Sequence, residues 1–136
     1  MIGELNIRVC QEKDLAAIAR LMEEAFGADA SHPLNPLYLS DPNIYCHIIE
    51  IDGQIVATAA LHILQKINRK LGQIEDVVVS GDRRGLGLGK KIVEHLIEQS
   101  KAEGCYKTIL NATDENVPFY AKMDFRVEQN QLVIRH

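Results

Sequence analysis

The sequence has no surplus of positive charge, no long apolar run and no paired cysteines. Its 136 residues carry a formal net charge of -4, whereas a nucleic-acid-binding domain would show a basic surplus. No apolar run approaches the length of a membrane span, and the N-terminus lacks the charged and apolar segments of a secretion signal. The 3 cysteines form no C-x-x-C pair, which favours reduced thiols. We therefore expect a cytosolic protein that binds neither nucleic acid nor membrane.

The length and composition indicate one soluble domain spanning residues 1–136. An apolar content of 46% and a charged content of 25% are typical of globular proteins, and a chain of this length buries a core without disulfides. The histidines show no metal-ligand spacing, so no metal is expected. His95 is expected at the surface of a helix. His32, in a proline-containing loop at 28–42 that would wall a substrate cleft, is a weaker candidate for the substrate site.

The stretch from Ile74 to Ser100 predicts a strand, a glycine-rich turn and a helix. The consecutive β-branched residues Val77–Val79 are typical of a strand buried on both faces. From Gly89 onward the apolar residues recur at helical spacing, at Ile92, Val93, Leu96 and Ile97. A helix that begins directly after glycines points its free backbone N–H groups, and the positive end of its dipole, at the turn. The pattern therefore predicts a phosphate-binding turn.

The spacing of the glycines narrows the choice of phosphate ligand. The P-loop pattern fails because Lys91 stands where a hydroxyl residue should hold magnesium, and the dinucleotide pattern fails because its third glycine would fall at Lys90 or Ile92. Residues Arg84–Gly89 instead match R-x-x-G-x-G. The alternative is an ordinary glycine-rich connection between a strand and a helix.

The rest of the chain predicts an α/β domain with the element order β-α-β-β-β-α-β-α-β. Asp52-Gly53 indicates a two-residue hairpin, and a right-handed crossover would place the strand at Tyr106–Leu110 parallel to Val77–Val79. A helix opens at Asp14 and ends at Gly27, and a short helix near Pro118 is capped by Asp114 or Asn116. The remaining strands are expected at Leu5–Val9, Ile44–Ile51, Gln54–Leu64, Phe125–Val127 and Gln131–Ile134, the last two closing the sheet as a hairpin or a bent strand.

This order, together with the R-x-x-G-x-G motif, resembles the GNAT superfamily of acetyl-CoA-dependent N-acetyltransferases. The resemblance implies the GNAT fold, a mixed and mostly antiparallel sheet with one parallel central pair. Within the superfamily, the C-terminal half is similar to the glucosamine 6-phosphate N-acetyltransferases in the segments QIVATAA (54–60), IEDVVV (74–79), GCYKTIL (104–110) and ENVPFY (115–120). It departs from them at Asn111, usually a carboxylate, at Asp124, usually a glycine, and in a shorter hairpin between Leu64 and Gly72, which in that family helps to bind the sugar phosphate.

The resemblance also implies roles for individual residues. Tyr120 would protonate the coenzyme A sulfur, with a core aromatic as the alternative, and Glu75 or Asp76 would accept the amine proton, with solvent-facing carboxylates as the alternative. Asn116 would contact coenzyme A, cap a helix, or do both. The complete set of expected acetyl-CoA contacts is Val77, Val78, Val79, Arg84, Gly85, Leu86, Gly87, Leu88, Gly89, Lys90, Asn111 and Asn116.

The sequence therefore predicts an N-acetyltransferase that moves acetyl directly from acetyl-CoA to a small-molecule amine, because no cysteine lies in a motif that would activate it as a nucleophile. An amino-sugar phosphate is the best specific acceptor. The alternatives are transfer to a polyamine, an amino acid or a protein N-terminus, and an acyl-CoA-binding regulator without turnover. Relatives in the similar family form homodimers, so a homodimer is expected.

Overall fold

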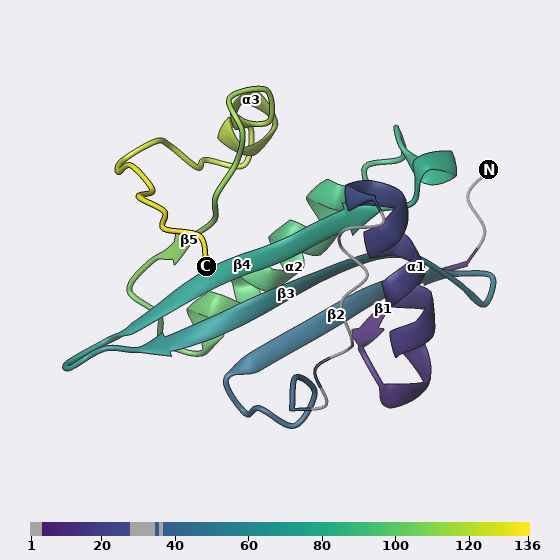
Figure 1. Ribbon diagram of the computed structural model, residues 1–136, viewed down its shortest axis with the longest axis horizontal. Helices are drawn as coiled ribbons and strands as arrows, with labels where there is room; N and C mark the ends of the chain where they lie inside the picture. Colours follow the sequence, from purple (N-terminus) through teal and green to yellow (C-terminus); the bar gives the residue numbers. More distant parts are fainter. Residues whose placement is uncertain (1–3, 28–34, 36) are drawn as a thin grey trace.

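The structure is a computed structural model that describes residues 4–27, 35 and 37–136. His32 and most of the loop before Leu37 lie outside the described residues. One five-stranded sheet, in the order β1-β2-β3-β4-β5, runs through the molecule (Figure 1). The strands are β1 (Leu5–Val9), β2 (Ile44–Ile51), β3 (Gln54–Gln65), β4 (Lys70–Val79) and β5 (Thr108–Ile109). Strands β1 to β4 pair antiparallel and β5 pairs parallel to β4, which confirms the expected mixed sheet.

The hairpin between β2 and β3 turns at Asp52 and Gly53, as the sequence predicts. Both residues have positive φ angles, 49° and 81°, which is the requirement of a two-residue turn whose twist matches that of the strands. The next hairpin is tighter than expected, because β4 begins at Lys70 and a backbone bond of 2.8 Å from Lys66 N to Arg69 O closes the turn. The central strand is therefore longer than its valine run.

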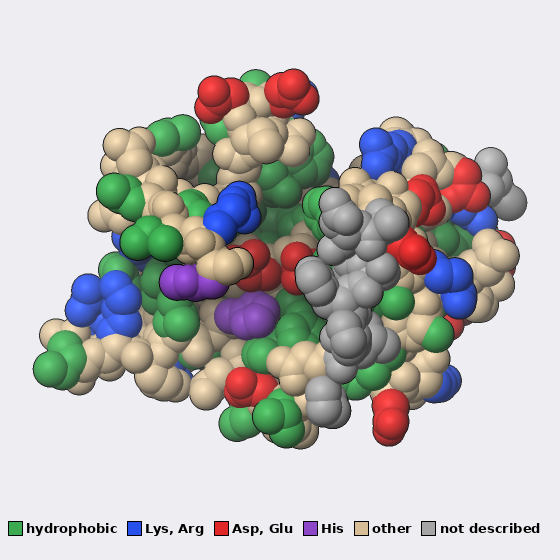
Figure 2. Space-filling model, viewed as in Figure 1, with side chains coloured by type: hydrophobic (Ala, Val, Ile, Leu, Met, Phe, Trp, Pro, Cys, Tyr) green, Lys and Arg blue, Asp and Glu red, His purple; other side chains and the backbone are tan. Residues whose placement is uncertain are grey.

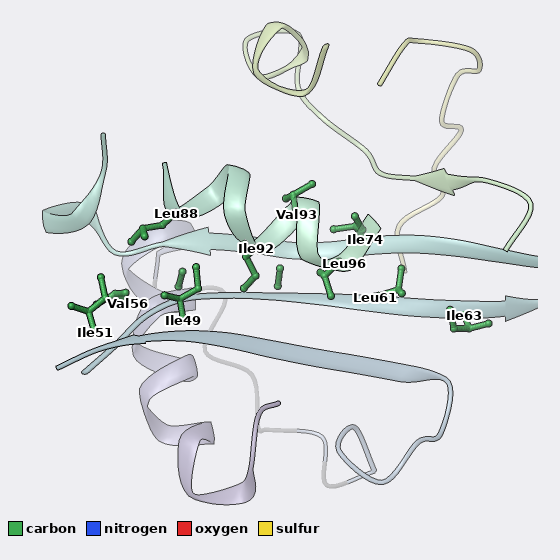
Figure 3. Packing of buried hydrophobic residues seen from close by; sticks show 12 residues of the cluster. Ile49, Ile51, Val56, Leu61, Ile63, Ile74, Leu88, Ile92, Val93 and Leu96 are labelled. Carbon is green, nitrogen blue, oxygen red and sulfur yellow. The ribbon is translucent and has the colours of Figure 1, made fainter. Parts of the chain in front are cut away.

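Two helices cover opposite faces of the sheet (Figure 1). Helix α2 (Leu88–Ala102) packs on one face, where its buried Ile92 and Leu96 meet Leu61 and Ile74 of the sheet (Figure 3). Helix α1 (Leu15–Phe26) packs on the other face over a smaller cluster that includes Cys10, Cys46, Ile48 and Ala60. A 3-10 turn at Glu12–Asp14 precedes α1, and Asp14 is held by Arg8, with which it makes a salt bridge of 2.7 Å. Across the described part of the chain, no helix is both long and apolar enough to cross a bilayer.

Strand β4 contains a β-bulge at Asp76. Thr58 pairs with Val78 but Ala60 pairs with Glu75, so that one more residue lies on β4 than on β3. Asp76 absorbs the extra residue with a φ of 53°, a left-handed conformation that aspartate tolerates better than most residues. Bulges redirect side chains by shifting the alternation of the strand. The alternation of side chains between the two faces of the sheet therefore shifts by one residue at Asp76.

The parallel pairing of β5 with β4 differs in register from the prediction. The pairs are Gly72 with Thr108 and Gln73 with Ile109, so β5 is shorter than the expected Tyr106–Leu110 and does not reach Val77–Val79. After Ile109 the chain leaves the sheet toward the short helix α3 (Val117–Ala121). Among the described residues, β3 is the only strand paired with Val77–Val79, and the chain after β5 leads away from the sheet to α3 (Figure 1).

The strands expected at Phe125–Val127 and Gln131–Ile134 are wrong for the single chain. Residues 125–136 have no regular secondary structure. Phe125 packs against the core, but Val127, Leu132 and Ile134 are 73%, 92% and 85% exposed. A strand needs a partner edge and a face to bury, and the two-residue β5 offers too short an edge within the same molecule.

Candidate active site

A cavity of about 550 Å³ lies where β4 and β5 diverge. Its walls come from the end of β4, the glycine-rich turn, the start of α2, helix α3 and the end of α1. They are formed by Ala25, Phe26, Val77, Val78, Val79, Arg83, Arg84, Gly85, Gly87, Leu88, Gly89, Lys90, Asn116, Phe119 and Tyr120. The cavity therefore joins the predicted phosphate-binding turn to the predicted catalytic tyrosine.

The turn at one end of the cavity requires glycine at two positions. Gly85 and Gly87 have φ angles of 82° and 75°, and Gly87 is the residue that precedes the first turn of α2. The first N–H to bond back along the chain is that of Lys91, which donates to the carbonyl of Gly87 at 3.1 Å. The N–H groups of residues 88–90 have no carbonyl partner in the helix. They give this end of the cavity donors and a positive dipole, both suited to an anion.

Cationic side chains surround the same turn. Arg83, Arg84 and Lys90 line the cavity, and none of the salt bridges found among the described residues involves them. The Arg83 guanidinium donates to the Gln54 side-chain oxygen at 3.5 Å, a weak contact with a neutral group. These charges are therefore available to a polyanionic ligand even though the whole chain is acidic.

Tyr120 lies on the opposite wall, on α3. Its half-buried ring packs edge-on against Phe119 and Phe125, with centroid distances of 5.0 and 5.9 Å. Burial raises the pKa of the Tyr120 phenol, so the hydroxyl is protonated throughout the neutral range. The geometry gives the cavity a proton donor that stays loaded at neutral pH.

Asn116 occupies the position before the first turn of α3, but its side chain makes no capping hydrogen bond. Because Pro118 stands in the first turn, that turn has one backbone donor fewer to satisfy. The Asn116 amide lines the cavity. Its donor and acceptor groups are therefore not used by the helix it precedes.

Glu75 and Asp76 do not line this cavity. The Glu75 carboxylate accepts a hydrogen bond of 2.5 Å from the Gln73 side chain. Burial, and then the charge of Glu75, raise the pKa of the Asp76 carboxyl, while His62 acts in the opposite direction. Figure 2 shows carboxylate and histidine side chains together in a hollow on the face of the sheet that carries α1. The two carboxylates thus lie outside the cavity, and Asp76 is close enough to Glu75 and His62 to feel their charges.

Two of the expected acetyl-CoA contacts do not line the cavity, and three residues that were not expected do. Leu86, 38% exposed, and Asn111, an exposed residue beyond the end of β5, are not among the residues that line the cavity. Phe26, Ala25 and Phe119 do line it and were not anticipated. Phe26 fits the helical period of α1, so nothing in the sequence distinguishes it from a core residue. Phe26 is 53% exposed, and it reaches the cavity only because α1 packs beside the glycine-rich turn.

Comparison with known proteins identifies the family. The acetyltransferase (GNAT) family model matches residues 15–125, most of the chain. The chain belongs to the GNAT acetyltransferase family. It is therefore an N-acetyltransferase, and enzymes of this family use acetyl-CoA as the acetyl donor. The described fold is the GNAT fold.

Two relatives carry the same enzymatic name. The chain is 34% identical to glucosamine 6-phosphate N-acetyltransferase of Trypanosoma brucei brucei, over 96% of this chain and 95% of that protein. It is 46% identical to glucosamine 6-phosphate N-acetyltransferase of Arabidopsis thaliana, over 60% of this chain and 58% of that protein. The match to the plant enzyme thus spans little more than half of either chain.

Solved GNAT structures superpose over nearly the whole chain. An acetyltransferase from Trypanosoma brucei has a TM-score of 0.85 at 33% identity, covering 98% of this chain and 100% of that one. Glucosamine-6-phosphate N-acetyltransferase from Arabidopsis thaliana has a TM-score of 0.83 at 30% identity, covering 98% and 99%. A predicted acetyltransferase from Clostridium acetobutylicum, solved with acetyl-CoA, has a TM-score of 0.78 at 20% identity, covering 97% and 96%, which is a likeness of fold alone.

Proposed function

We propose that this GNAT enzyme transfers acetyl from acetyl-CoA directly to the amine of an amino-sugar phosphate such as glucosamine 6-phosphate. The observation that carries the proposal is the cavity at the divergence of β4 and β5, which joins a cationic, glycine-rich helix start to a half-buried tyrosine. A coenzyme A thioester has the matching features, a pyrophosphate at one end and a thioester at the other.

The proposed contacts with acetyl-CoA divide along the cavity. The pyrophosphate lies against the N–H groups of residues 88–90 and the cations Arg84 and Lys90. The pantetheine arm runs beside Val77–Val79, whose backbone groups have no strand partner on the cavity side among the described residues. Backbone donors released there are suited to hold the thioester carbonyl as negative charge develops on it. Asn116 adds an amide from α3.

Starting from the ammonium, the transfer removes two protons from nitrogen and supplies one to sulfur. Glu75 or Asp76 accepts the first proton, and the neutral amine attacks the thioester carbonyl to form the C–N bond. The C–S bond then breaks, Tyr120 donates its phenolic proton to the departing thiolate, and the nitrogen gives its second proton to the Tyr120 phenolate, which leaves a neutral amide and a reprotonated tyrosine. The raised pKa of the Tyr120 phenol suits a general acid, and positioned general acids and bases contribute about 10²- to 10⁴-fold each in rate.

The choice of acceptor rests on the names of the related proteins, T. brucei brucei and A. thaliana enzymes that act on glucosamine 6-phosphate. Two departures favour the alternative acceptors, another amine such as a polyamine, an amino acid or a protein N-terminus. Asn111 stands where the family usually carries a carboxylate, and the hairpin between β3 and β4 is short. A regulator that binds acyl-CoA without turnover is the third candidate.

A panel of amines tests the proposed acceptor. Coenzyme A release is measured with glucosamine 6-phosphate, unphosphorylated glucosamine, spermidine, free amino acids and a peptide with a free N-terminus. We expect release with glucosamine 6-phosphate and much less with glucosamine, because only the former offers a dianionic group. Release with another member alone contradicts the sugar phosphate. Tight acetyl-CoA binding with no release from any amine favours the regulator.

We also propose that two copies of the chain form a homodimer through the C-terminal segment, residues 125–136. Its apolar side chains at Leu132 and Ile134 are 92% and 85% exposed, and burying them against a second copy would contribute favourably. Light scattering after size exclusion should give twice the chain mass for the parent and one chain mass for a Leu132→Glu, Ile134→Glu variant. Ile67→Glu, a change at another fully exposed isoleucine, should leave the dimer intact. A monomeric parent contradicts the proposal.

A further inference from the structure

His62 lies beside the two carboxylates of β4, on the face of the sheet that carries α1. It pairs across the strands with Gln73, two residues before Glu75. Its neighbours Leu61 and Ile63 point into the core under α2, and side chains alternate along a strand. The His62 imidazole therefore projects from the face of the sheet that carries α1, the face on which Figure 2 shows histidine and carboxylate side chains close together.

A tyrosine from another element holds the imidazole on its other side. Tyr38, in the turn at 37–40, places its ring 5.9 Å from the ring of His62, with 57° between the planes. The charge of Asp76 raises the pKa of the Tyr38 phenol, and the charge of His62 lowers the pKa of the Asp76 carboxyl. The three side chains, from three separate segments, therefore form one polar group on this face of the sheet.

The bulge in β4 explains why Asp76 belongs to this group. Ile74, Val77 and Val79 all pack into the core under α2, and without an extra residue Asp76 would point the same way as Ile74. The bulge, with its φ of 53° at Asp76, leaves two consecutive carboxylates, Glu75 and Asp76, out of that core. Two adjacent negative charges repel one another, so a nearby cation favours the ionised form of Asp76.

We propose that His62 is a positioning residue of the acceptor side, whose imidazolium charge keeps the Asp76 carboxylate ionised and able to accept the acceptor's proton when the solution is slightly acidic. This deepens the proposed function and rests on it. Histidine suits the role because its charge changes near neutral pH. The other groups that bear on the pair are Glu75 on β4, Tyr38 in the turn and Cys46 on β2.

The charge of His62 determines the direction in which the pKa of Asp76 should move when His62 is replaced. A positive neighbour favours the ionised carboxylate, and its removal favours the protonated one. Burial and Glu75 already raise the pKa of Asp76, and His62 opposes them. Without His62, Asp76 should take up its proton at a higher pH, so that less of the enzyme carries an active base in weak acid.

Two substitutions at His62 separate charge from packing. His62→Gln removes the charge and keeps a polar side chain, and His62→Lys restores a charge. The matched control is His95→Gln, an exposed histidine on α2 at the opposite face. The measured quantity is the ratio of variant to parent kcat from pH 5 to 9, in which the ionisation of the amine substrate cancels.

We expect the His62→Gln ratio to be lowest at acid pH, by about tenfold for a shift of one pH unit, and to approach one above neutrality. The His62→Lys ratio should stay near one at acid pH, and the His95→Gln ratio should be flat. A His62→Gln ratio that is the same at every pH indicates a packing role and overturns the inference.

A second measurement does not depend on turnover. The carboxyl signal of Asp76, followed by NMR in carboxyl-labelled protein, should titrate at higher pH in His62→Gln than in the parent and return toward the parent value in His62→Lys. Equal midpoints in all three proteins overturn the inference even if acetylation proceeds. A parent that titrates as expected but acetylates no amine contradicts the proposed function instead.

Discussion

The two halves of β4 differ in how their edges are paired. Residues 70–73 are closed, because they pair with β3 on one edge and β5 or the chain before it on the other. A side chain added at Gly72 would come within 2.3 Å of Ser100 Oγ, which accepts a hydrogen bond of 2.7 Å from Thr108. Residues 75–79 are open on that side, and Val77–Val79 border the cavity instead. The closed half thus sets the position from which β5 leaves, and its departure creates the opening.

The same comparison separates fold from chemistry. In the closed half, Leu71 is buried and Gly72 is tightly packed. Both edges of this half pair with other segments of the chain. The open half collects a bulge, two carboxylates and backbone groups without a strand partner among the described residues. Substitutions in the closed half should therefore change stability, and substitutions around the open half should change binding or turnover.

The largest effect is expected at the tyrosine facing the open half. Tyr120→Phe keeps the ring and its packing against Phe119 and Phe125 but removes the proton donor. We expect kcat to fall by about 10²- to 10⁴-fold, with little change in the melting temperature or in acetyl-CoA affinity. Tyr106→Phe, at an exposed tyrosine on the chain before β5, is the control and should retain full activity.

The raised pKa of the Tyr120 phenol also predicts how turnover changes at alkaline pH. Because burial raises the pKa of this phenol, the donor stays protonated beyond the ordinary tyrosine value of about 10. In the parent, turnover should not fall between pH 8 and 10 for loss of the acid. Undiminished turnover in Tyr120→Phe would show that another group protonates the thiolate.

The closed half is tested at Gly72. Gly72→Ala forces a methyl group against Ser100, and overpacking of this kind costs about 1–3 kcal/mol of unfolding free energy. Urea unfolding followed by circular dichroism measures the loss. Adding Ser100→Ala should recover part of it, because the closest contact is with the Ser100 hydroxyl.

Acetyl-CoA affinity of the folded Gly72→Ala protein should match that of the parent. A variant that keeps its stability but binds acetyl-CoA more weakly would reverse the division between the two halves of β4.

The smallest effect on stability is expected at the bulge. Asp76→Asn removes a charge and keeps a residue that tolerates positive φ, so the bulge and the stability should be preserved to within about 0.5 kcal/mol. If Asp76 is the base, kcat falls; if Glu75 alone is the base, kcat changes little. Steady-state kinetics with the best amine of the panel, beside a melting curve, distinguishes the two carboxylates.

Local sequence signals predicted the parts of the fold that depend on neighbouring residues. The Asp52-Gly53 turn, the four antiparallel strands and the helix after the glycines were all predictable, since each depends on a short pattern. The C-terminal strands were not, because Leu132 and Ile134 have the alternation of a strand but pair with none of the five strands among the described residues. The bulge at Asp76 also left no local signal, since it depends on register with β3.

The site shows the same division. Gly85, Gly87 and the cations of the turn followed from spacing and from the resemblance to GNAT enzymes, and they line the cavity. Phe26 joins them from a helix far away in the sequence, and its role depends on how α1 packs. Asn111 was expected at the cofactor, but the early departure of the chain from β5 leaves it outside the cavity lining.

The central claim is that the turn before α2 binds the pyrophosphate of acetyl-CoA, and isothermal titration calorimetry tests it most directly. The comparison is Gly87→Trp against Gly104→Trp, because both glycines have positive φ (75° and 79°) and open space around them, at opposite ends of α2. We predict that the parent and Gly104→Trp bind acetyl-CoA alike, and that Gly87→Trp binds at least about tenfold more weakly, a loss of about 1.4 kcal/mol. Equal affinity of all three proteins would contradict the account.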